Sequence, residues 1–228
     1  HARVQILGLG NCEIEPLYER FRQVFSALHR EKLLTCETVN VKSASSVREV
    51  QETMGVAQCK LVMGFRTSVC QPQEQVPAMK LAVAILGGTP SSKLFLNVRE
   101  KQSLCYYCSA SYNSMKGIML VQSGVEQKNL QKARTEILAQ LDALKRGDFT
   151  DEEISAARLS LLNAYHSASD SLGALSGWYL TQAISGLPQT LEEAAAAMEA
   201  VTREELIEAA SQITLDTVYS LLGKGTEE

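Results

Sequence analysis

Arg99 and Tyr106 are the two side chains of this 228-residue sequence whose types and spacing best suit chemistry. They stand seven residues apart in the stretch LGGTPSSKLFLNVREKQSLCYYCS, between a short amphipathic helix and a β-rich run. A guanidinium and a phenol can both assist catalysis as hydrogen-bond donors, but neither supplies a metal-activated water. The sequence contains no H-x-x-E-H or H-E-x-x-H motif. The pair would therefore assist a reaction that this chain does not perform alone.

The six cysteines show no regular framework spacing, which favours reduced, mostly buried thiols and a cytoplasmic location. Cys105 and Cys108 form a single C-x-x-C, whereas a structural zinc site usually needs a second Cys or His pair. On a regular strand, positions 105 and 108 point to opposite faces, which argues against a shared metal or a redox role.

Other candidates for chemistry are weaker. His29 and His166 have no ligand or base neighbour at metal spacing, so solvated or packing roles are expected for both. Gly8-Leu-Gly10 follows an apolar segment, as a phosphate-binding loop would, but Glu13 stands where the third glycine of G-x-G-x-x-G is required. An acidic residue at that position disfavours binding of a pyrophosphate.

The composition is that of an ordinary globular chain, with 45% hydrophobic and 21% charged residues. A net charge of −4 argues against a nucleic-acid partner, and no apolar run is long enough to span a bilayer, so no membrane partner is expected. No Gly/Ser-rich linker divides residues 1–228, which predicts a single domain. The sequence opens abruptly on an apolar segment, and we expect it to be a fragment of a longer chain.

Hydrophobic periodicity predicts a mixture of strands and helices in the first half of the chain. Gly87 and Gly88 should end one helix, and Ser91 or Ser92 should cap the next. The expected elements are a buried strand over Arg3–Leu9, a helix from Pro16 to about His29, a loop or edge segment over Thr38–Val56, a strand over Ala57–Arg66, a helix over Ala78–Leu86, and hairpin strands over Leu104–Tyr112 and Gly117–Ser123.

The second half is predicted to be mostly helical. Leu130 to Leu144 carries one apolar stripe that ends at Gly147, and T-x-x-E capping boxes begin at Thr150, Thr190 and Thr202. A last strand is expected over Thr217–Leu222. These elements indicate an α+β fold, with a single mixed β-sheet covered by helices.

The segment LGGTPSSKLFLNVREKQSLCYYCSASY resembles the corresponding segment in the C-terminal domain of pitrilysin-type (M16, mitochondrial-processing-peptidase-like) zinc peptidases. Members commonly read LGG-x-x-SSRLF-x-x-(L/V)RE-x-x-x-L-x-Y at this point. Lys93 replaces the usual arginine of SSRLF, and the D-x-E-I-x-x-A-(K/R) run at Asp151–Arg158 also agrees. The resemblance covers nearly the whole chain and implies a LuxS/MPP-like metallohydrolase-type domain.

The resemblance also implies partners. Proteins of this type form clamshells in which one half holds zinc through H-x-x-E-H and a downstream glutamate, and the other half contributes an arginine and a tyrosine. Arg99 and Tyr106 match those two positions, where they would contact a peptide carbonyl and the developing oxyanion. No cofactor is expected in this chain, and zinc is expected in a missing N-terminal domain or a partner subunit.

Two versions of this hypothesis remain open, together with one alternative. The zinc motif could lie in an N-terminal domain of the same parent chain, or the parent could lack zinc and pair with a homologous active subunit as a homo- or heterodimer. A peptide or protein is the expected substrate in both. The alternative is a non-catalytic scaffold subunit that keeps the fold, in which Arg99 is an ordinary surface residue and Tyr106 is sheet packing.

Overall fold

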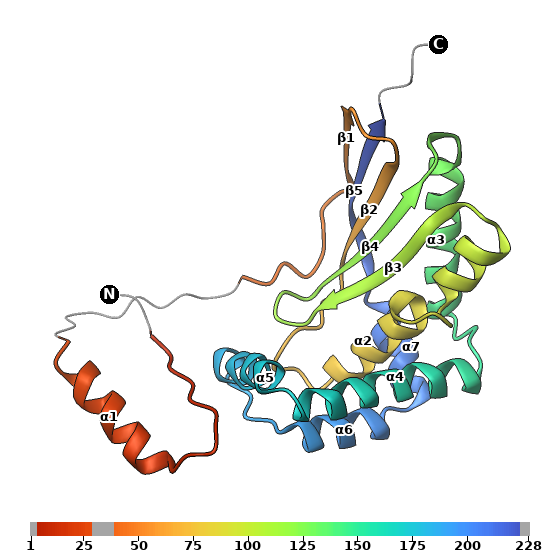
Figure 1. The fold of residues 1–228 in the computed structure, drawn as a ribbon. Helices are drawn as coiled ribbons and strands as arrows, with labels where there is room; N and C mark the ends of the chain where they lie inside the picture. The colour runs from red at the N-terminus through yellow and green to blue at the C-terminus, as the bar shows by residue number, and fades with distance from the viewer. Residues whose placement is uncertain (1–3, 29–38, 224–228) are drawn as a thin grey trace.

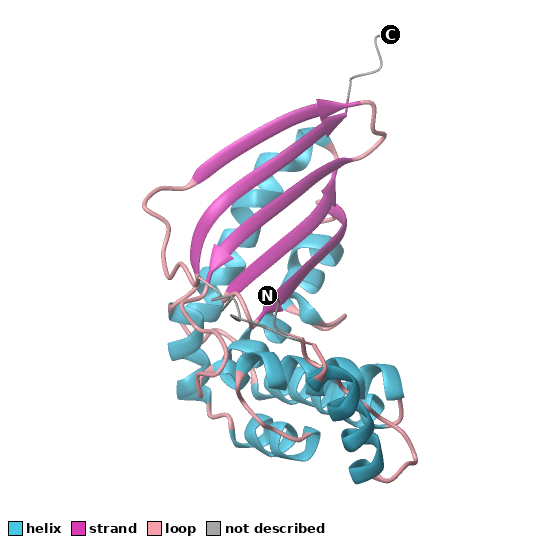
Figure 2. Ribbon diagram, turned by 90° about the vertical axis from the view of Figure 1, so that its left-hand side faces the viewer, coloured by secondary structure: helices cyan, strands magenta, loops and turns pink. Residues whose placement is uncertain are grey.

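The computed structural model describes residues 4–28 and 39–223. Its centre is one five-stranded mixed sheet in the order β1-β5-β2-β4-β3, with helices against one face (Figures 1 and 2). Strand β1 (Arg48–Met54) runs parallel to β5 (Thr214–Gly223), and β2 (Cys59–Arg66), β4 (Ile118–Val125) and β3 (Cys105–Asn113) follow in antiparallel pairs. The predicted α+β fold with a single mixed sheet is thus confirmed.

The sheet has one buried face and one open face. Along β2 the side chains of Leu61, Met63 and Phe65 are fully buried toward the helices, while the residues between them remain accessible. Because successive side chains of a strand point to opposite faces, this alternation places the helices on a single side.

The helical layer begins directly after β2. Helix α2 packs on α7 and leads into η1, and both η1 and η2 are π-helical segments that contact β3. Helix α4 packs on α6 below the sheet (Figure 1). The segments are α2 (Val76–Val83), η1 (Ala84–Gly88), η2 (Leu94–Lys101), η3 (Gln127–Asn129), α3 (Leu130–Lys145), α4 (Asp151–Ser169), α5 (Leu172–Ser185), α6 (Leu191–Ala200) and α7 (Arg203–Ser211).

The three predicted capping boxes are all present. Each threonine accepts a hydrogen bond from the backbone N–H three residues on, and each of Glu153, Glu193 and Glu205 accepts one from its threonine's N–H at 2.8 Å. At the start of each helix, two backbone N–H groups that have no partner within the helix thereby gain one. This is why the starts of α4, α6 and α7 are readable from the sequence.

The prediction of a buried strand at Arg3–Leu9 is wrong for its described part. Residues 4–13 form no strand, and Val4 and Ile6 are exposed. A strand needs a neighbour for its backbone hydrogen bonds, and the five-stranded sheet of the described residues pairs with none of this segment. Helix α1 (Ile14–Ser26) confirms the helix expected from Pro16, but it lies apart from the sheet and buries none of its side chains (Figure 1). His29, Arg3 and Cys36 lie outside the described residues.

Two further expectations concern the segment that contains β1 and the start of η2. The region 38–56 contains β1, so its described part is an edge strand preceded by a loop. The predicted serine cap of the next helix is wrong, because η2 begins at Leu94 and its N-cap residue, Lys93, makes no capping hydrogen bond through its side chain. The Ser92 hydroxyl is buried and has no hydrogen-bond partner among the described residues.

Candidate functional site

Arg99 and Tyr106, the two residues singled out from the sequence, line the same pocket. It has a volume of about 390 Å³ and lies where η2 leads into β3. Its other lining residues are Glu100, Ser103, Leu104, Cys105, Glu126 and Asn129. The structure therefore brings the arginine and the tyrosine to one place and surrounds them with polar groups.

Arg99 is held from two directions but stays accessible. Its guanidinium carbon lies 4.5 Å from the centre of the Phe95 ring, one turn earlier on η2. Its Nη1 lies 3.5 Å from a carboxylate oxygen of Glu100, and 38% of the side chain is exposed. A guanidinium has five N–H donors, so these contacts leave donors available to a ligand in the pocket.

Tyr106 is the extra residue of a β-bulge. In the pairing of β3 with β4, Cys105 lies opposite Val125 while Tyr107 lies opposite Gly124, so Tyr106 has no partner of its own. A bulge re-aims a side chain out of the regular alternation. The Tyr106 side chain is 61% exposed, which is more than half-buried sheet packing would allow.

The same bulge corrects the prediction made for the C-x-x-C. Cys105 pairs with Val125 and Cys108 with Ser123, two positions that lie on one face of β4. Cys105 and Cys108 therefore lie on the same face of β3, whereas a regular strand would have placed them on opposite faces. One inserted residue is sufficient to bring the two thiols together.

Local hydrogen bonds fix this corner of the fold. The Leu104 N–H donates to the carbonyl oxygen of Val98 at 3.1 Å, which ties the start of β3 to η2. The Ser123 hydroxyl donates to the carbonyl oxygen of Tyr107 at 2.9 Å, beside the bulge. Ser103 takes a φ of +50°, and this left-handed conformation turns the chain between η2 and β3.

Gly87 allows η1 to approach the sheet. A Cβ placed on Gly87 would lie 2.6 Å from the backbone nitrogen of Ala110 in β3 and 2.8 Å from a methyl carbon of Leu94. Only a residue without a side chain fits there. The first glycine of the LGG motif thus sets the distance between η1 and the strand that carries Tyr106.

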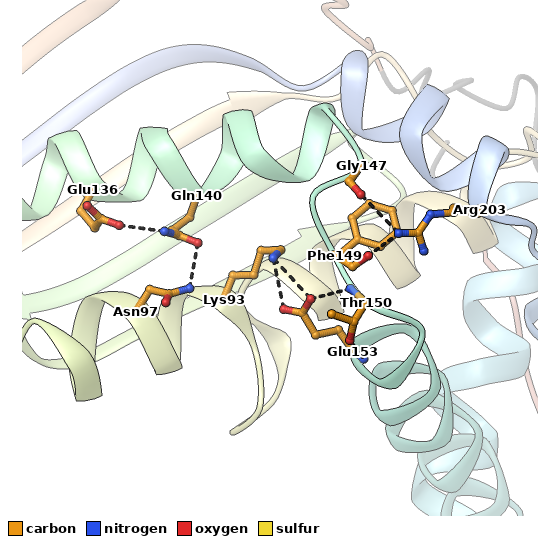
Figure 3. A network of polar contacts seen from close by, with 9 residues as sticks. All are labelled: Lys93, Asn97, Glu136, Gln140, Gly147, Phe149, Thr150, Glu153 and Arg203. Carbon is orange, nitrogen blue, oxygen red and sulfur yellow. Dashed lines mark hydrogen bonds and ion pairs between the residues drawn. The ribbon is translucent and has the colours of Figure 1, made fainter.

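Lys93 fastens the segment that carries Arg99 to helix α4 (Figure 3). Its Nζ lies 3.2 Å from one carboxylate oxygen of Glu153 and 3.4 Å from the other, and only 9% of the lysine side chain is exposed. Glu153 also accepts the Thr150 N–H of the capping box. On the next turn of η2, the Asn97 amide donates to Gln140 of α3 at 2.9 Å.

The described residues offer no zinc site and no membrane span. They contain no group of three or more His, Cys, Asp or Glu side chains placed to hold a metal ion. His166 lies in the last turn of α4 without such neighbours. Within the same ranges, none of the helices has the length and apolar character needed to cross a bilayer.

Comparison with known proteins identifies the class. The family model described as "Peptidase M16 inactive domain" matches residues 2–161, which is more than half of the chain. The chain therefore belongs to the M16 peptidase family, and to its inactive type of domain, as the resemblance of the LGG-x-x-SS stretch implied.

Individual relatives agree with this assignment. The chain is 38% identical over 180 residues to the "Probable inactive metalloprotease YmfF" of Bacillus subtilis, a match that covers 79% of this chain and 42% of that protein. A conserved protein of Enterococcus faecalis superposes with a TM-score of 0.86 at 30% identity, over 96% of this chain and 52% of the other. A Helicobacter pylori protease shares the fold at 18% identity, with a TM-score of 0.83 over 93% and 53% of the two chains. The chain spans about half the length of these relatives.

Proposed function

We propose that this domain forms one wall of a peptide-binding chamber shared with another M16 domain or subunit, and that Arg99 and Tyr106 contact the bound peptide there. The observation that carries the proposal is their convergence on one pocket, with the phenol on a bulge and the guanidinium held by Phe95 and Glu100. Guanidinium and phenol donors suit a peptide carbonyl, and they suit it best when negative charge develops on its oxygen.

The need for a second domain is supported by two observations. The matching family model is described as an inactive domain and the chain spans about half the length of its relatives, so we place the hydrolytic zinc of the proposal in another domain, and no step depends on its geometry here. Helix α1 and the segment before it expose apolar side chains that lie together, since Val4, Ile6 and Tyr18 line one shallow pocket. Contiguous apolar surface of this kind is typical of a face that another domain covers.

The tests use the full-length parent protein, alone and mixed with its nearest homologous subunit. Zinc content and peptide turnover in the parent alone would place the zinc motif in the same chain, whereas turnover only in the mixture would make this domain part of a zinc-free partner subunit. In whichever assembly is active, Tyr106→Phe is expected to lower kcat about tenfold or more, because loss of one oxyanion donor commonly costs ~10²-fold.

Tyr107→Phe is the matched control for Tyr106→Phe. It removes the same hydroxyl from the adjacent residue, which does not line the pocket, and should leave turnover unchanged. Arg99→Gln should raise KM through loss of a contact with the bound peptide, while Lys101→Gln, at an exposed residue outside the pocket, should not. Unchanged turnover in Tyr106→Phe would refute the assisting role.

A non-catalytic scaffold is the second candidate function. It is favoured by the description of the Bacillus subtilis relative as a probable inactive metalloprotease. Under this hypothesis no combination of parent and homologue hydrolyses peptides, although the two still associate. Association without turnover, measured by analytical ultracentrifugation and peptide assay on the same samples, would support the scaffold over the assisting role.

A further inference from the structure

We propose that Cys105 is a site of reversible thiol modification inside the Arg99–Tyr106 pocket, at which a low-molecular-weight disulfide exchanges onto the Cys105 sulfur. The inference does not depend on the proposed peptide chamber, because it concerns the chemistry of the thiol pair alone. It rests on the position of the two cysteines relative to the bulge and the pocket.

The geometry separates the two thiols by accessibility. Cys105 lines the pocket and is partly exposed, whereas Cys108 is buried with 4% of its surface accessible. The bulge at Tyr106 places both on one face of β3. A reagent that enters the pocket can therefore reach Cys105. Cys108 lies next to Cys105 on its buried side and is shielded from the reagent.

The surroundings of Cys105 favour its thiolate. A hydrogen bond from the Cys108 thiol lowers the pKa of Cys105 to about 7, against the opposing effect of partial burial, and the Arg99 guanidinium acts in the same direction. Glu100 and Glu126 are the carboxylates that line the pocket with it, and each has a cationic neighbour, Arg99 and Lys128 respectively. The hydrogen bond to Cys105 and burial raise the pKa of Cys108, so Cys108 stays protonated.

The reaction is a balanced exchange. The Cys105 thiolate attacks one sulfur of a disulfide RSSR, the S–S bond of the reagent breaks, and a Cys105–SR bond forms as RS⁻ leaves with the electron pair. The Cys105 sulfur is oxidised and the departing sulfur is reduced. Because Cys108 keeps its proton, the mixed disulfide is the expected product. The added group would occupy the pocket in front of Arg99 and Tyr106 until a thiol reductant removes it.

The expected rate follows from two opposing effects. At pH 7 a thiol with a pKa of about 7 is half ionised, against about 1% for one at the ordinary value of 9.0. A thiolate of lower pKa is also a weaker nucleophile, with a Brønsted slope of about 0.4–0.5. The lower pKa therefore slows the attack of each thiolate by a factor of roughly six to ten. The net expectation is a reaction about five to eight times faster than that of the same thiol without the shift.

The experiment exposes the full chain to glutathione disulfide between pH 6 and pH 10 and follows each cysteine by peptide mass spectrometry. Cys105 should acquire glutathione with a pH midpoint near 7 and lose it on addition of dithiothreitol. The accessible Cys12 is an internal reference for reagent supply, and the buried Cys59 for the intactness of the fold. Absence of an adduct on Cys105, or a midpoint near 9, would overturn the proposal.

Variants of Cys108 test the role of the hydrogen bond. In Cys108→Ala the rate at Cys105 should fall about fivefold at pH 7 and its midpoint should rise, whereas Cys108→Ser keeps a hydroxyl donor and should retain most of the rate. Equal rates in the wild type and both variants would overturn the assignment of Cys108. Should the alanine variant fail to fold, the wild-type midpoint and the serine variant still decide the outcome.

Discussion

Replacing Glu153 with glutamine should destabilise this domain by about 3 kcal/mol, far more than the same change in its other two capping boxes. Glu153, Glu193 and Glu205 occupy the same position in equivalent boxes, and each accepts the N–H of its threonine at 2.8 Å. Glutamine serves a capping box as well as glutamate does, so the capping function survives in all three variants. Only Glu153 also neutralises a buried lysine, Lys93.

The magnitude follows from what Glu153→Gln leaves behind. The Lys93 side chain is 9% exposed and that of Glu153 is 22% exposed, so the pair is largely removed from water. Removing one partner of a buried pair costs ~3–5 kcal/mol, and the partial exposure of Glu153 favours the lower end. For a protein of this size, about 3 kcal/mol corresponds to a fall in Tm of roughly 6–12 °C.

The assay is equilibrium unfolding in urea, with thermal melting as a second measurement. Glu193→Gln and Glu205→Gln are the matched controls and should each stay within about 0.5 kcal/mol of the wild type. A loss in Glu153→Gln no larger than theirs would refute the reasoning, because Lys93 would then not depend on its partner.

A double-mutant cycle locates the cost in the pair. Lys93→Met removes the buried charge and keeps an apolar side chain of similar length, while Glu153 retains its hydrogen bond to Thr150. In the Lys93→Met background, Glu153→Gln should cost less than about 1 kcal/mol, since no charge is left unpaired. A cost in that background equal to the cost in the wild type would show that the capping box, and not Lys93, is responsible.

Two other perturbations have clear expectations. Gly87→Ala should lower the free energy of unfolding by about 1–3 kcal/mol, because its Cβ would lie 2.6 Å from the Ala110 nitrogen. Gly177→Ala lies in the interior of α5 with no atom near the new Cβ, and it should raise the free energy of unfolding by about 0.5–1 kcal/mol. Urea unfolding of the two variants and the wild type measures both effects. Burial raises the pKa of Tyr112 above its ordinary value near 10, so the unfolded state loses this proton at a lower pH than the folded state does. The stability contributed by the neutral phenol is therefore fully present below about pH 10 and falls as the pH rises above it, so Tyr112→Phe should lose less stability than the wild type when melting is followed from about pH 8 to about pH 12.

Elements with local signals were predictable from the sequence. The capping boxes of α4, α6 and α7 place two hydrogen bonds within four residues, so the start of each helix is encoded where it occurs. The strand β2 was predictable because its period-2 alternation records burial against a helical layer. The LGG motif marks a helix end in the sequence, although the contact of Gly87 with Ala110 is visible only in the structure.

Elements that depend on distant partners were not predictable in the same way. An apolar segment such as residues 4–9 has the composition of a strand, but strand formation requires a neighbouring edge, and no edge among the described residues pairs with it. Ser91 and Ser92 have the residue type of helix caps, yet the chain buries Ser92 and begins η2 two residues later. Lys93, which reads as a conservative exchange for arginine, is a buried ion-pair partner because α4 supplies Glu153 from 60 residues away.

The candidate site was also predictable only in part, because one of its features, the bulge in β3, depends on how β3 pairs with β4. The residue types and the seven-residue spacing of Arg99 and Tyr106 were legible in the sequence, and the structure brings the two to one pocket. For their neighbour Cys105 the sequence predicts no role, because a regular strand would turn it away from Cys108. A bulge is a mismatch between two strands, so it exists only in the pairing of β3 with β4 and leaves little trace in β3 itself.

One unpaired residue, Tyr106, therefore exposes the phenol and aligns the two thiols, which links the proposed peptide contact and the proposed thiol chemistry to a single backbone feature. Removing the bulge by deleting a residue would be expected to change both at once, whereas the side-chain variants separate them.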